Sequence, residues 1–325
     1  MRTRRAVIAA GSAWALAARI RLAFAREGYP QNTIRLIMPF APGGNTDGNA
    51  RLVAQWLGER LGVAVIVENQ GGAGGAIAAK TVARASPDGY TLFFSALPQI
   101  AIVPAMESAG YDPVKDFAPV SAVGTNPFVL LTHPSLPVKT LAEFVDYVRQ
   151  RPGKLTYASA GIGSLAHLSM VLLLRRAGLE MIHVPYKGDA PAMVDLLGGQ
   201  APVYFGNLSV ATPQVRAGAL RALAISDDHR SAQLPEVPTV AEAGYPGFRT
   251  LTWNGLLAPA ATPRPVIDIL AGEIRSAVAD PVFARRLMDF GVEPLGSSPA
   301  EFAATIASDI KIWTDAVNVE GLGAH

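Results

Sequence analysis

Short apolar runs that end in glycine-rich loops and lead into amphipathic helices recur along most of the chain. The run over residues 33–40 ends in a Pro-Gly-Gly loop, and the segment after it has apolar residues spaced three and four apart. Helices are expected between further strands at residues 63–67, 90–95, 154–158, 181–186, 203–208, 220–226 and 252–257. This alternation of strand and helix is typical of parallel α/β layers. The sequence therefore predicts an α/β fold, and 325 residues are enough for two domains of about 150 residues each.

The first 25 residues have the pattern of an export signal. Arg2, Arg4 and Arg5 precede an apolar stretch over residues 6–18, and Ala23-Phe24-Ala25 fits a cleavage site. That stretch is shorter than the roughly 20 residues that a membrane-spanning helix needs. We therefore expect residues 1–25 to be a signal peptide for the Sec or twin-arginine route, and the mature protein to be periplasmic.

Composition narrows the class of function. Five of the 28 basic residues are arginines within residues 1–25, which leaves 23 basic against 26 acidic residues in the rest of the chain. A mildly acidic mature chain gives no electrostatic basis for nucleic-acid binding. The sequence has no cysteine, which excludes a disulfide framework, a thiol nucleophile and a cysteine-ligated metal. It also has no compact metal-ligand spacing, so neither a metal nor another cofactor is expected.

Three loops share one design, in which a strand is followed by glycine and small residues and then by the start of a helix. They span residues 39–47, 69–75 and 159–164. The first N–H groups of a helix lack partners within it and carry a partial positive charge, so they bind anions without a cationic side chain. Because each half is expected to hold at least one such loop, we interpret them as walls of a shared cleft. The alternative is that each glycine only makes a tight turn.

Signatures of an enzyme are weak. Residues 161–166 match the dinucleotide fingerprint formally, but the next predicted strand, residues 181–186, does not end in the acid that holds a ribose. No nucleophile elbow and no zinc-protease motif occurs. His167 lies one turn into a helix after Ser164, where a local hydrogen bond explains it as well as a ligand contact does. We predict a binding protein and not an enzyme; a nucleotide-dependent enzyme that uses the same loops is the competing class.

Ordered sequence matches sharpen this prediction. The matching stretches are Tyr29-Pro30, Ile37 to Asp47, residues 67–69, 72–75, 87–92, 112–117, 157–167, 183–188 and 238–244, and Leu257-Ala258-Pro259 before Thr262-Pro263. In this order they resemble the Bug family, the extracytoplasmic binding components of tripartite tricarboxylate transporters. The stretches span almost the whole mature chain.

The resemblance implies a two-domain periplasmic-binding-protein (Venus flytrap) fold with the ligand in the interdomain cleft. Domain 1 would comprise residues 26–124 plus 252–325 and domain 2 residues 125–251, with chain crossings near residues 123–126 and 250–253. Family members hold small carboxylates on backbone amides of the first and third loops. Carried over to this sequence, the ligand-binding residues are Phe40, Ala41, Gly43, Gly44, Asn45, Thr46, Asp47, Ser95, Ser159, Ala160, Gly161, Gly163, Ser164, His167, Lys187 and Asn207.

Two positions depart from the family pattern. Ile162 stands where many relatives carry Asn, and Gly206 precedes Asn207 where an Asp is common. Both changes remove a polar group near the expected cleft. The sequence therefore favours a less polar carboxylate, aromatic or aliphatic, over an amino acid that needs a partner for its ammonium group.

The predicted function is capture of a small mono- or dicarboxylate, aromatic acids included, by a monomeric periplasmic protein. Its expected partners are the membrane permease subunits of a tripartite tricarboxylate-type transporter, with no role for nucleic acid. A ligand-loaded sensor that docks on a signalling receptor would use the same closed form, so this alternative stays open.

Overall fold

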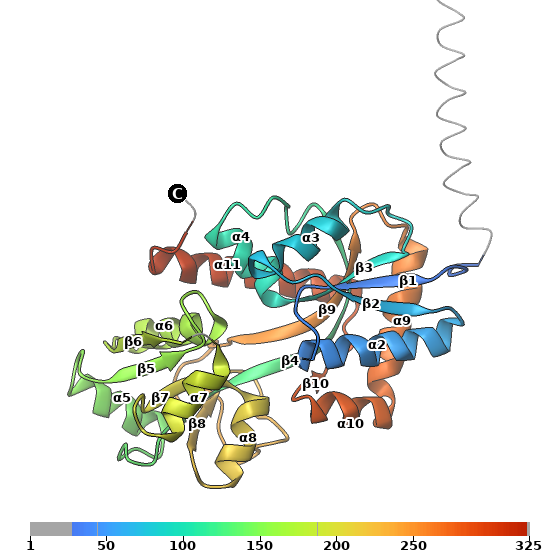
Figure 1. Cartoon of the computed structure of the whole chain (residues 1–325). Helices are drawn as coiled ribbons and strands as arrows, with labels where there is room; N and C mark the ends of the chain where they lie inside the picture. The colour runs from blue at the N-terminus through green and yellow to red at the C-terminus, as the bar shows by residue number, and fades with distance from the viewer. Residues whose placement is uncertain (1–27, 44, 187, 324–325) are drawn as a thin grey trace, which may run out of the picture.

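The computed structural model describes residues 28–43, 45–186 and 188–323 (Figure 1). The predicted signal peptide and two predicted site residues, Gly44 and Lys187, lie outside the described residues, as does the side chain of Asn45. Within the described part, no helix is both long and apolar enough to cross a membrane.

Two lobes are joined by two long strands (Figure 1). The first lobe contains β1 (Ile34–Met38), β2 (Val65–Asn69), β3 (Thr91–Ala96), β10 (Glu293–Pro294), α2 (Asn45–Leu61), the 3-10 helix η1 (Ala73–Gly75), α3 (Ala76–Ala83), α9 (Arg264–Ala279) and α10 (Pro281–Asp289). The second lobe contains β5 (Thr156–Ser159), β6 (Ile182–Pro185), β7 (Val203–Asn207), β8 (Arg221–Ile225), α5 (Leu141–Arg149), α6 (Leu165–Ala177), α7 (Asp189–Leu197) and α8 (Leu208–Arg216). The crossing strands are β4 (Phe117–Thr132) and β9 (Leu251–Pro259). The remaining helices are the π-helix η2 (Pro98–Ile102), α4 (Val103–Met106) and α11 (Pro299–Val319).

The strands follow the order β2-β1-β3-β9-β4-β7-β5-β6, and β8 and β10 also pair with β4. Pairing is parallel within each lobe, between β1 and its neighbours and between β5 and its neighbours, as the strand–helix alternation predicts. It is antiparallel wherever β4 or β9 takes part. A chain that enters the second lobe and returns needs two strands of opposite direction, so the crossing cannot be parallel.

β4 serves both lobes in turn. Residues 117–127 pair with β9, and residues 128–132 pair with β7 and β8. The partners therefore change at residues 127–128, next to the expected crossing at 123–126. The predicted division into residues 26–124 plus 252–325 and residues 125–251 stays a prediction.

Alternate residues of β1 supply two buried clusters, because successive side chains of a strand point to opposite faces. Leu36 and Met38 pack with apolar residues of α2 and α9, such as Leu57 and Leu270. Ile37 faces the other way and belongs to a cluster that continues through β4 into the second lobe. The lobes therefore share buried apolar contacts as well as two strands.

Local capping signals predict several helix ends. The Ser164 side chain caps α6 by accepting the N–H of His167, and Gly178 ends this helix in the left-handed conformation. Thr140 caps α5 in the same way, but its spacing to Glu143 does not make a full capping box, since the Glu143 carboxylate accepts from the N–H of Lys139. A full capping box forms instead at α11, between Ser298 and Glu301.

Candidate functional site

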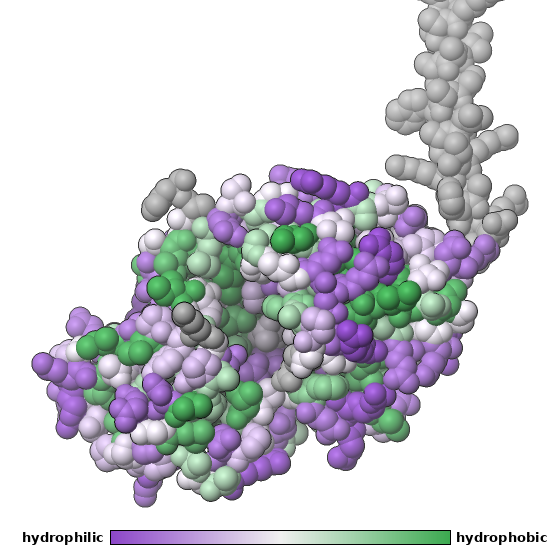
Figure 2. All heavy atoms as spheres, viewed as in Figure 1, coloured by the Kyte–Doolittle hydropathy of each residue, from purple (hydrophilic) through white to green (hydrophobic). Residues whose placement is uncertain are grey.

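A cavity of about 500 Å³ lies between the lobes. Figure 2 views this face, where the surface is hollowed between the lobes. The described residues that line the cavity are Phe40, Thr46, Asn49, Ala96, Pro98, Asn126, Phe128, Ala160, Ser164, Leu165, Ala166, Asp189, Asn207, Ser209, Val210, Thr252 and Asn254. They come from both lobes and from both crossing strands.

Four helices begin at this cavity. Thr46 lies in the first turn of α2, Ser164 caps α6, Asp189 begins α7 and Asn207 caps α8. The N–H groups of a first helical turn have no partner within the helix and carry a partial positive charge. Each of these helix starts places at least one residue in the cavity wall. The cavity therefore has the electrostatic character of an anion site, although no lysine or arginine is among its described lining residues.

The wall of the first lobe is held by a buried carboxylate. Asp47, 4% exposed, accepts hydrogen bonds from the Gly43 N–H (3.0 Å), from Arg51 Nε (2.9 Å) and from Asn69 Nδ2 (2.8 Å). Burial alone would raise the pKa of Asp47, but the hydrogen bonds from Arg51, Asn69 and Gly43 together outweigh it and lower this pKa to about 2. Asp47 therefore stays ionised and ties the loop to α2 and to β2.

The wall of the second lobe is held by two stacked histidines. His167, 3% exposed, accepts the Gly163 N–H at Nδ1 (3.2 Å) and stacks on His183 with 3.9 Å between ring centroids. His183 Nε2 lies 2.6 Å from Ser159 Oγ, which also accepts the Gly161 N–H (3.1 Å). Burial, together with the neighbouring His183, lowers the pKa of His167 to about 4, and burial also lowers the pKa of His183. Both rings are therefore neutral near pH 7.

The floor of the cavity is made by the crossing strands. Asn126 of β4 pairs directly with Thr252 of β9, and Asn254 lies two residues further on. Asn49 of α2 donates its side-chain amide to Asn254 Oδ1 (3.3 Å). The side-chain oxygens of Asn49 and Asn126 are buried and accept no hydrogen bond within the described part of the chain. Because a buried acceptor without a donor is costly, the floor of the cavity carries two unsatisfied polar groups.

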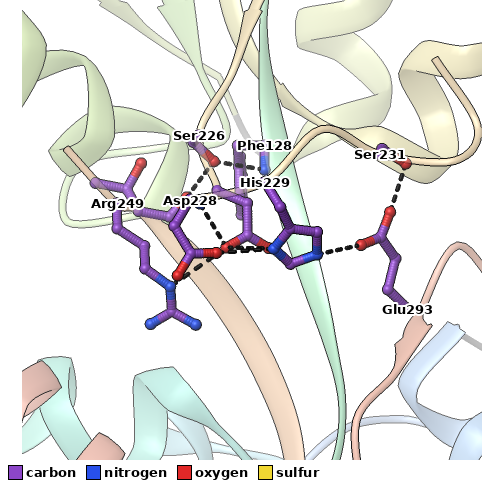
Figure 3. Close-up of polar contacts among 9 residues, drawn as sticks. Phe128, Ser226, Asp228, His229, Ser231, Arg249 and Glu293 are labelled. Carbon is purple, nitrogen blue, oxygen red and sulfur yellow. Dashed lines mark hydrogen bonds and ion pairs between the residues drawn. The ribbon is translucent and has the colours of Figure 1, made fainter. Parts of the chain in front are cut away.

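A polar network ties the lobes together beside the crossing strands (Figure 3). Ser226, at the end of β8, accepts the Phe128 N–H of β4 (2.8 Å) and donates to the Thr250 carbonyl ahead of β9. His229 Nδ1 lies 2.8 Å from Asp228 Oδ1, and His229 Nε2 lies 3.4 Å from Glu293 Oε2 of β10. The hydrogen bond to Asp228, with the charges of Asp227 and Glu293, raises the pKa of His229.

Three residues of this network have ligand atoms close enough for a metal ion. Asp227, Asp228 and His229 each place one such atom within 4.8 Å of the others. Arg249 Nε already lies 3.3 Å from Asp227 Oδ1, and both nitrogens of the His229 ring face carboxylates. We therefore interpret the group as an ion-pair network between the lobes and not as a metal centre.

The structure brings part of the predicted site together at the cavity. Of the predicted residues, it places in the wall Phe40, Thr46, Ala160, Ser164 and Asn207. Behind the wall it buries Asp47, Ser95, Ser159 and His167. In the loops it places Ala41, Gly43, Gly161 and Gly163. The N–H groups of Gly43 and Gly163 are both engaged by side chains behind the wall, so these glycines shape the loops.

The structure also corrects the reasoning from Ile162 and Gly206. The Ile162 side chain is 62% exposed and is not among the described residues that line the cavity. At Gly206 an added Cβ would lie 2.8 Å from Tyr204 Cε1, so the Tyr204 ring occupies the space of a side chain there. Asp189, which no sequence motif singled out, is an exposed acidic residue of the wall. The cleft therefore keeps an acidic group, against the sequence expectation.

Comparison with known proteins identifies the family. Residues 49–322 match the family model described as the tripartite tricarboxylate transporter family receptor, TctC. The chain belongs to this family. Protein BugT of Bordetella pertussis is 38% identical to it over 295 residues, which cover 90% of each chain. The resemblance to the Bug family is therefore confirmed.

Solved structures of TctC relatives agree with the fold. Rpa4515 of R. palustris, solved with adipate, has a TM-score of 0.76 and 35% identity, and the match covers 91% of this chain and 99% of the relative. MatC of Rhodopseudomonas palustris, solved with bound malate, has a TM-score of 0.72 and 36% identity, covering 89% of this chain and 100% of the relative. The predicted α/β, two-domain periplasmic-binding-protein fold is confirmed, and the chain is a solute-binding protein of the TctC family.

Proposed function

We propose that this protein captures a small carboxylate in the interlobe cavity and presents it to the membrane permease subunits of a tripartite tricarboxylate-type transporter. The observation that carries the proposal is the convergence of four helix starts on one cavity. Backbone N–H groups there attract a carboxylate without a cationic side chain. The bound adipate of Rpa4515 and the bound malate of MatC, both small carboxylates, support the same ligand class.

The N–H groups of Leu165 and Ala166 are the best placed to bind the carboxylate. Both residues line the cavity and begin α6, where the N–H of the third residue, His167, is already taken by Ser164 Oγ (3.2 Å). Thr46 offers a comparable position at α2 on the opposite wall. A carboxylate with one oxygen on each wall would bridge the lobes.

Thermal melting with a panel of mono- and dicarboxylates tests the proposal. A true ligand at 100 times its dissociation constant stabilises the fold by about 2.7 kcal/mol, which is easily visible as a melting shift. Native mass spectrometry of protein purified without refolding would identify a retained ligand. A panel in which no carboxylate shifts melting while a nucleotide does would overturn the proposal.

The proposal includes a periplasmic, monomeric protein whose two domains close on the ligand. Closure would bury a small acid that neither lobe encloses alone, and the crossing strands would absorb the bend. Small-angle scattering with and without the ligand measures both the particle mass and the radius of gyration. A radius unchanged at saturation would contradict closure, and a doubled mass would contradict the monomer.

A further inference from the structure

Asp189 is the one charged side chain among the described residues that line the cavity. It begins α7, and its Oδ1 accepts a hydrogen bond from the phenol of Tyr204. An ionised carboxylate accepts hydrogen bonds but cannot donate them. Asp189 therefore places a negative charge in a cavity whose helix starts otherwise favour anions.

Tyr204 holds Asp189 from behind the wall. Tyr204 lies on β7 and is fully buried, and Gly206 leaves room for its ring. Burial, with the neighbouring charge of Asp189, raises the pKa of Tyr204, so the phenol keeps its proton and donates. The Asp189 carboxylate is therefore oriented by a rigid partner on the sheet.

Other acceptors in the same cavity also lack donors. The side-chain oxygens of Asn49 and Asn126 are buried, accept nothing within the described residues, and belong to lining residues. These two oxygens lie behind the cavity surface, so the acceptor at the wall itself is Asp189, opposite the N–H groups of the helix starts. A ligand that satisfies both has a carboxylate at one end and a hydrogen-bond donor at the other.

We infer that Asp189 determines specificity by accepting a hydrogen bond from a hydroxyl or ammonium group at the far end of the bound carboxylate. A second carboxylate at that end would meet the Asp189 charge and be disfavoured. This inference rests on the proposed carboxylate binding and adds the class of ligand: hydroxy or amino monocarboxylates are preferred over dicarboxylates of the same length.

The competing explanation is local. An acid in the first turn of a helix stabilises that helix by its charge alone, and Asp189 occupies such a position in α7. That role would change stability but not the order in which ligands bind, so ligand selectivity separates the two explanations.

Calorimetric titration of the wild type and of Asp189→Asn with two matched ligand sets tests the inference. The first set is succinate, γ-hydroxybutyrate and γ-aminobutyrate; the second is adipate, ε-hydroxycaproate and ε-aminocaproate. In the wild type the hydroxy or amino acid should bind more tightly than the dicarboxylate in at least one set. In Asp189→Asn the affinity for the amino acid should fall about tenfold to a hundredfold, while that for the dicarboxylate should rise about tenfold.

Asp195→Asn is the matched control. Asp195 lies on the same helix and accepts from a tyrosine in the same manner, with Tyr186 Oη 2.6 Å from Asp195 Oδ2, but it is not among the described lining residues. This variant should keep the wild-type order of ligands. Tyr204→Phe keeps the Asp189 charge but removes the phenol that orients it. This variant should bind the hydroxy or amino acid with a smaller advantage over the dicarboxylate, without reversing their order.

The outcomes separate this inference from the proposed function. If no ligand of either set, nor any carboxylate of the melting panel, binds the wild type, the proposed carboxylate capture fails. If the wild type binds dicarboxylates at least as tightly as their matched partners in both sets, or Asp189→Asn leaves the order unchanged, only the role of Asp189 is overturned.

Discussion

The two walls of the cleft use similar hydrogen bonds, but the acceptor is charged in one wall and neutral in the other. In the first lobe the Gly43 N–H donates to Asp47, four residues later (3.0 Å). In the second lobe the Gly163 N–H donates to His167, also four residues later (3.2 Å). Asp47 is ionised, with a pKa lowered to about 2, whereas His167 is neutral, with a pKa lowered to about 4.

This difference shows how each loop is kept rigid without a positive charge in the cavity. Both glycine N–H groups are used to hold their loops, so the groups left for a ligand are those at the helix starts. In the first wall the acceptor can stay charged because Arg51 forms an ion pair with it. The second wall lies against a buried ring stack, where desolvation disfavours a charge.

The largest effect is expected at Gly163. Its φ of +75° is strained for any side chain, and an added Cβ would lie 2.5 Å from Met106 Cε of α4. Met106 Cε is the end of a flexible, half-buried side chain that can move aside, so the backbone strain decides the effect. Gly163→Ala should therefore displace the loop and lower the affinity for the best carboxylate of the melting panel roughly tenfold, in line with a strain of about 1–2 kcal/mol. Calorimetric titration measures this.

Gly178→Ala is the control for Gly163. Gly178 has a φ of +61° at the other end of the same helix, and its added Cβ would meet nothing within 4 Å. Both variants should lose about 1–2 kcal/mol of unfolding free energy from backbone strain. Equal loss of affinity in both variants would mean that the Gly163 loop has no special part in binding.

Asp47→Asn should have the next largest effect. The amide keeps one acceptor oxygen but loses the charge that pairs with Arg51, so the free energy of unfolding should fall by about 1–3 kcal/mol. Urea denaturation measures the loss. Asp268→Asn is the control, because Asp268 pairs with Arg264 Nε at a similar 2.8 Å on the exposed face of α9. The free energy of unfolding of this variant should fall by no more than about 0.5 kcal/mol. A fall equal to that of Asp47→Asn would contradict the role of Asp47 in holding the first wall.

The charge states of the two walls predict separate pH windows. The pKa of His167 falls from 6.5 to about 4 on folding, so the unfolded chain binds a proton first and stability is lost as pH falls from 6.5 to 4. The pKa of Asp47 falls from 3.8 to about 2, so its contribution is lost only between pH 3.8 and 2. As the pH is lowered, the second wall should therefore lose its stabilisation before the first wall does.

Between pH 6.5 and 4 the His167→Gln variant should lose up to about 3 kcal/mol less stability than the wild type. The reason is that glutamine can still accept the Gly163 N–H but does not titrate. Denaturation at a series of pH values measures the difference.

The groups that face His167 are His183, which adds to the same window, and Glu320 at 3.7 Å, which opposes it. His229→Gln is the control: the pKa of His229 is raised, so its stabilisation is complete below pH 6.5 and is lost only as pH rises further. If the free energy of unfolding fell equally steeply with pH in His167→Gln and in the wild type, the conclusion that the His167 ring is neutral would be contradicted.

The smallest effect is expected at Ile162. Its side chain is exposed and lies off the described cavity wall, so Ile162→Asn should change stability and binding by no more than about 0.5 kcal/mol, or about twofold in affinity. Titration with the same ligand measures this. A large gain for an amino acid would restore the sequence-based view that Ile162 sets ligand polarity.

Local patterns predicted most of the elements. The spacing of apolar residues after the Pro-Gly-Gly loop corresponds to α2, and a helix begins after Ser164 as expected. The 16-residue strand β4 was not predicted from the sequence. Pro119 and Pro127 interrupt its strand pattern, and it is almost wholly buried because it pairs with both lobes. A pattern confined to neighbouring residues cannot report such pairing.

By itself, the sequence determined that the chain alternates strands and helices, that its glycine loops precede helix starts, and to which family it belongs. These are properties of neighbouring residues and of their order. Only the tertiary structure decided that Asn49 and Asn254, 205 residues apart, share the floor of the cavity, and that Asp189 and not position 206 supplies its acid. The physical reason is that a cavity is made by the packing of separate strands and helices, and Tyr204 selects the position of the carboxylate by filling space that no local pattern describes.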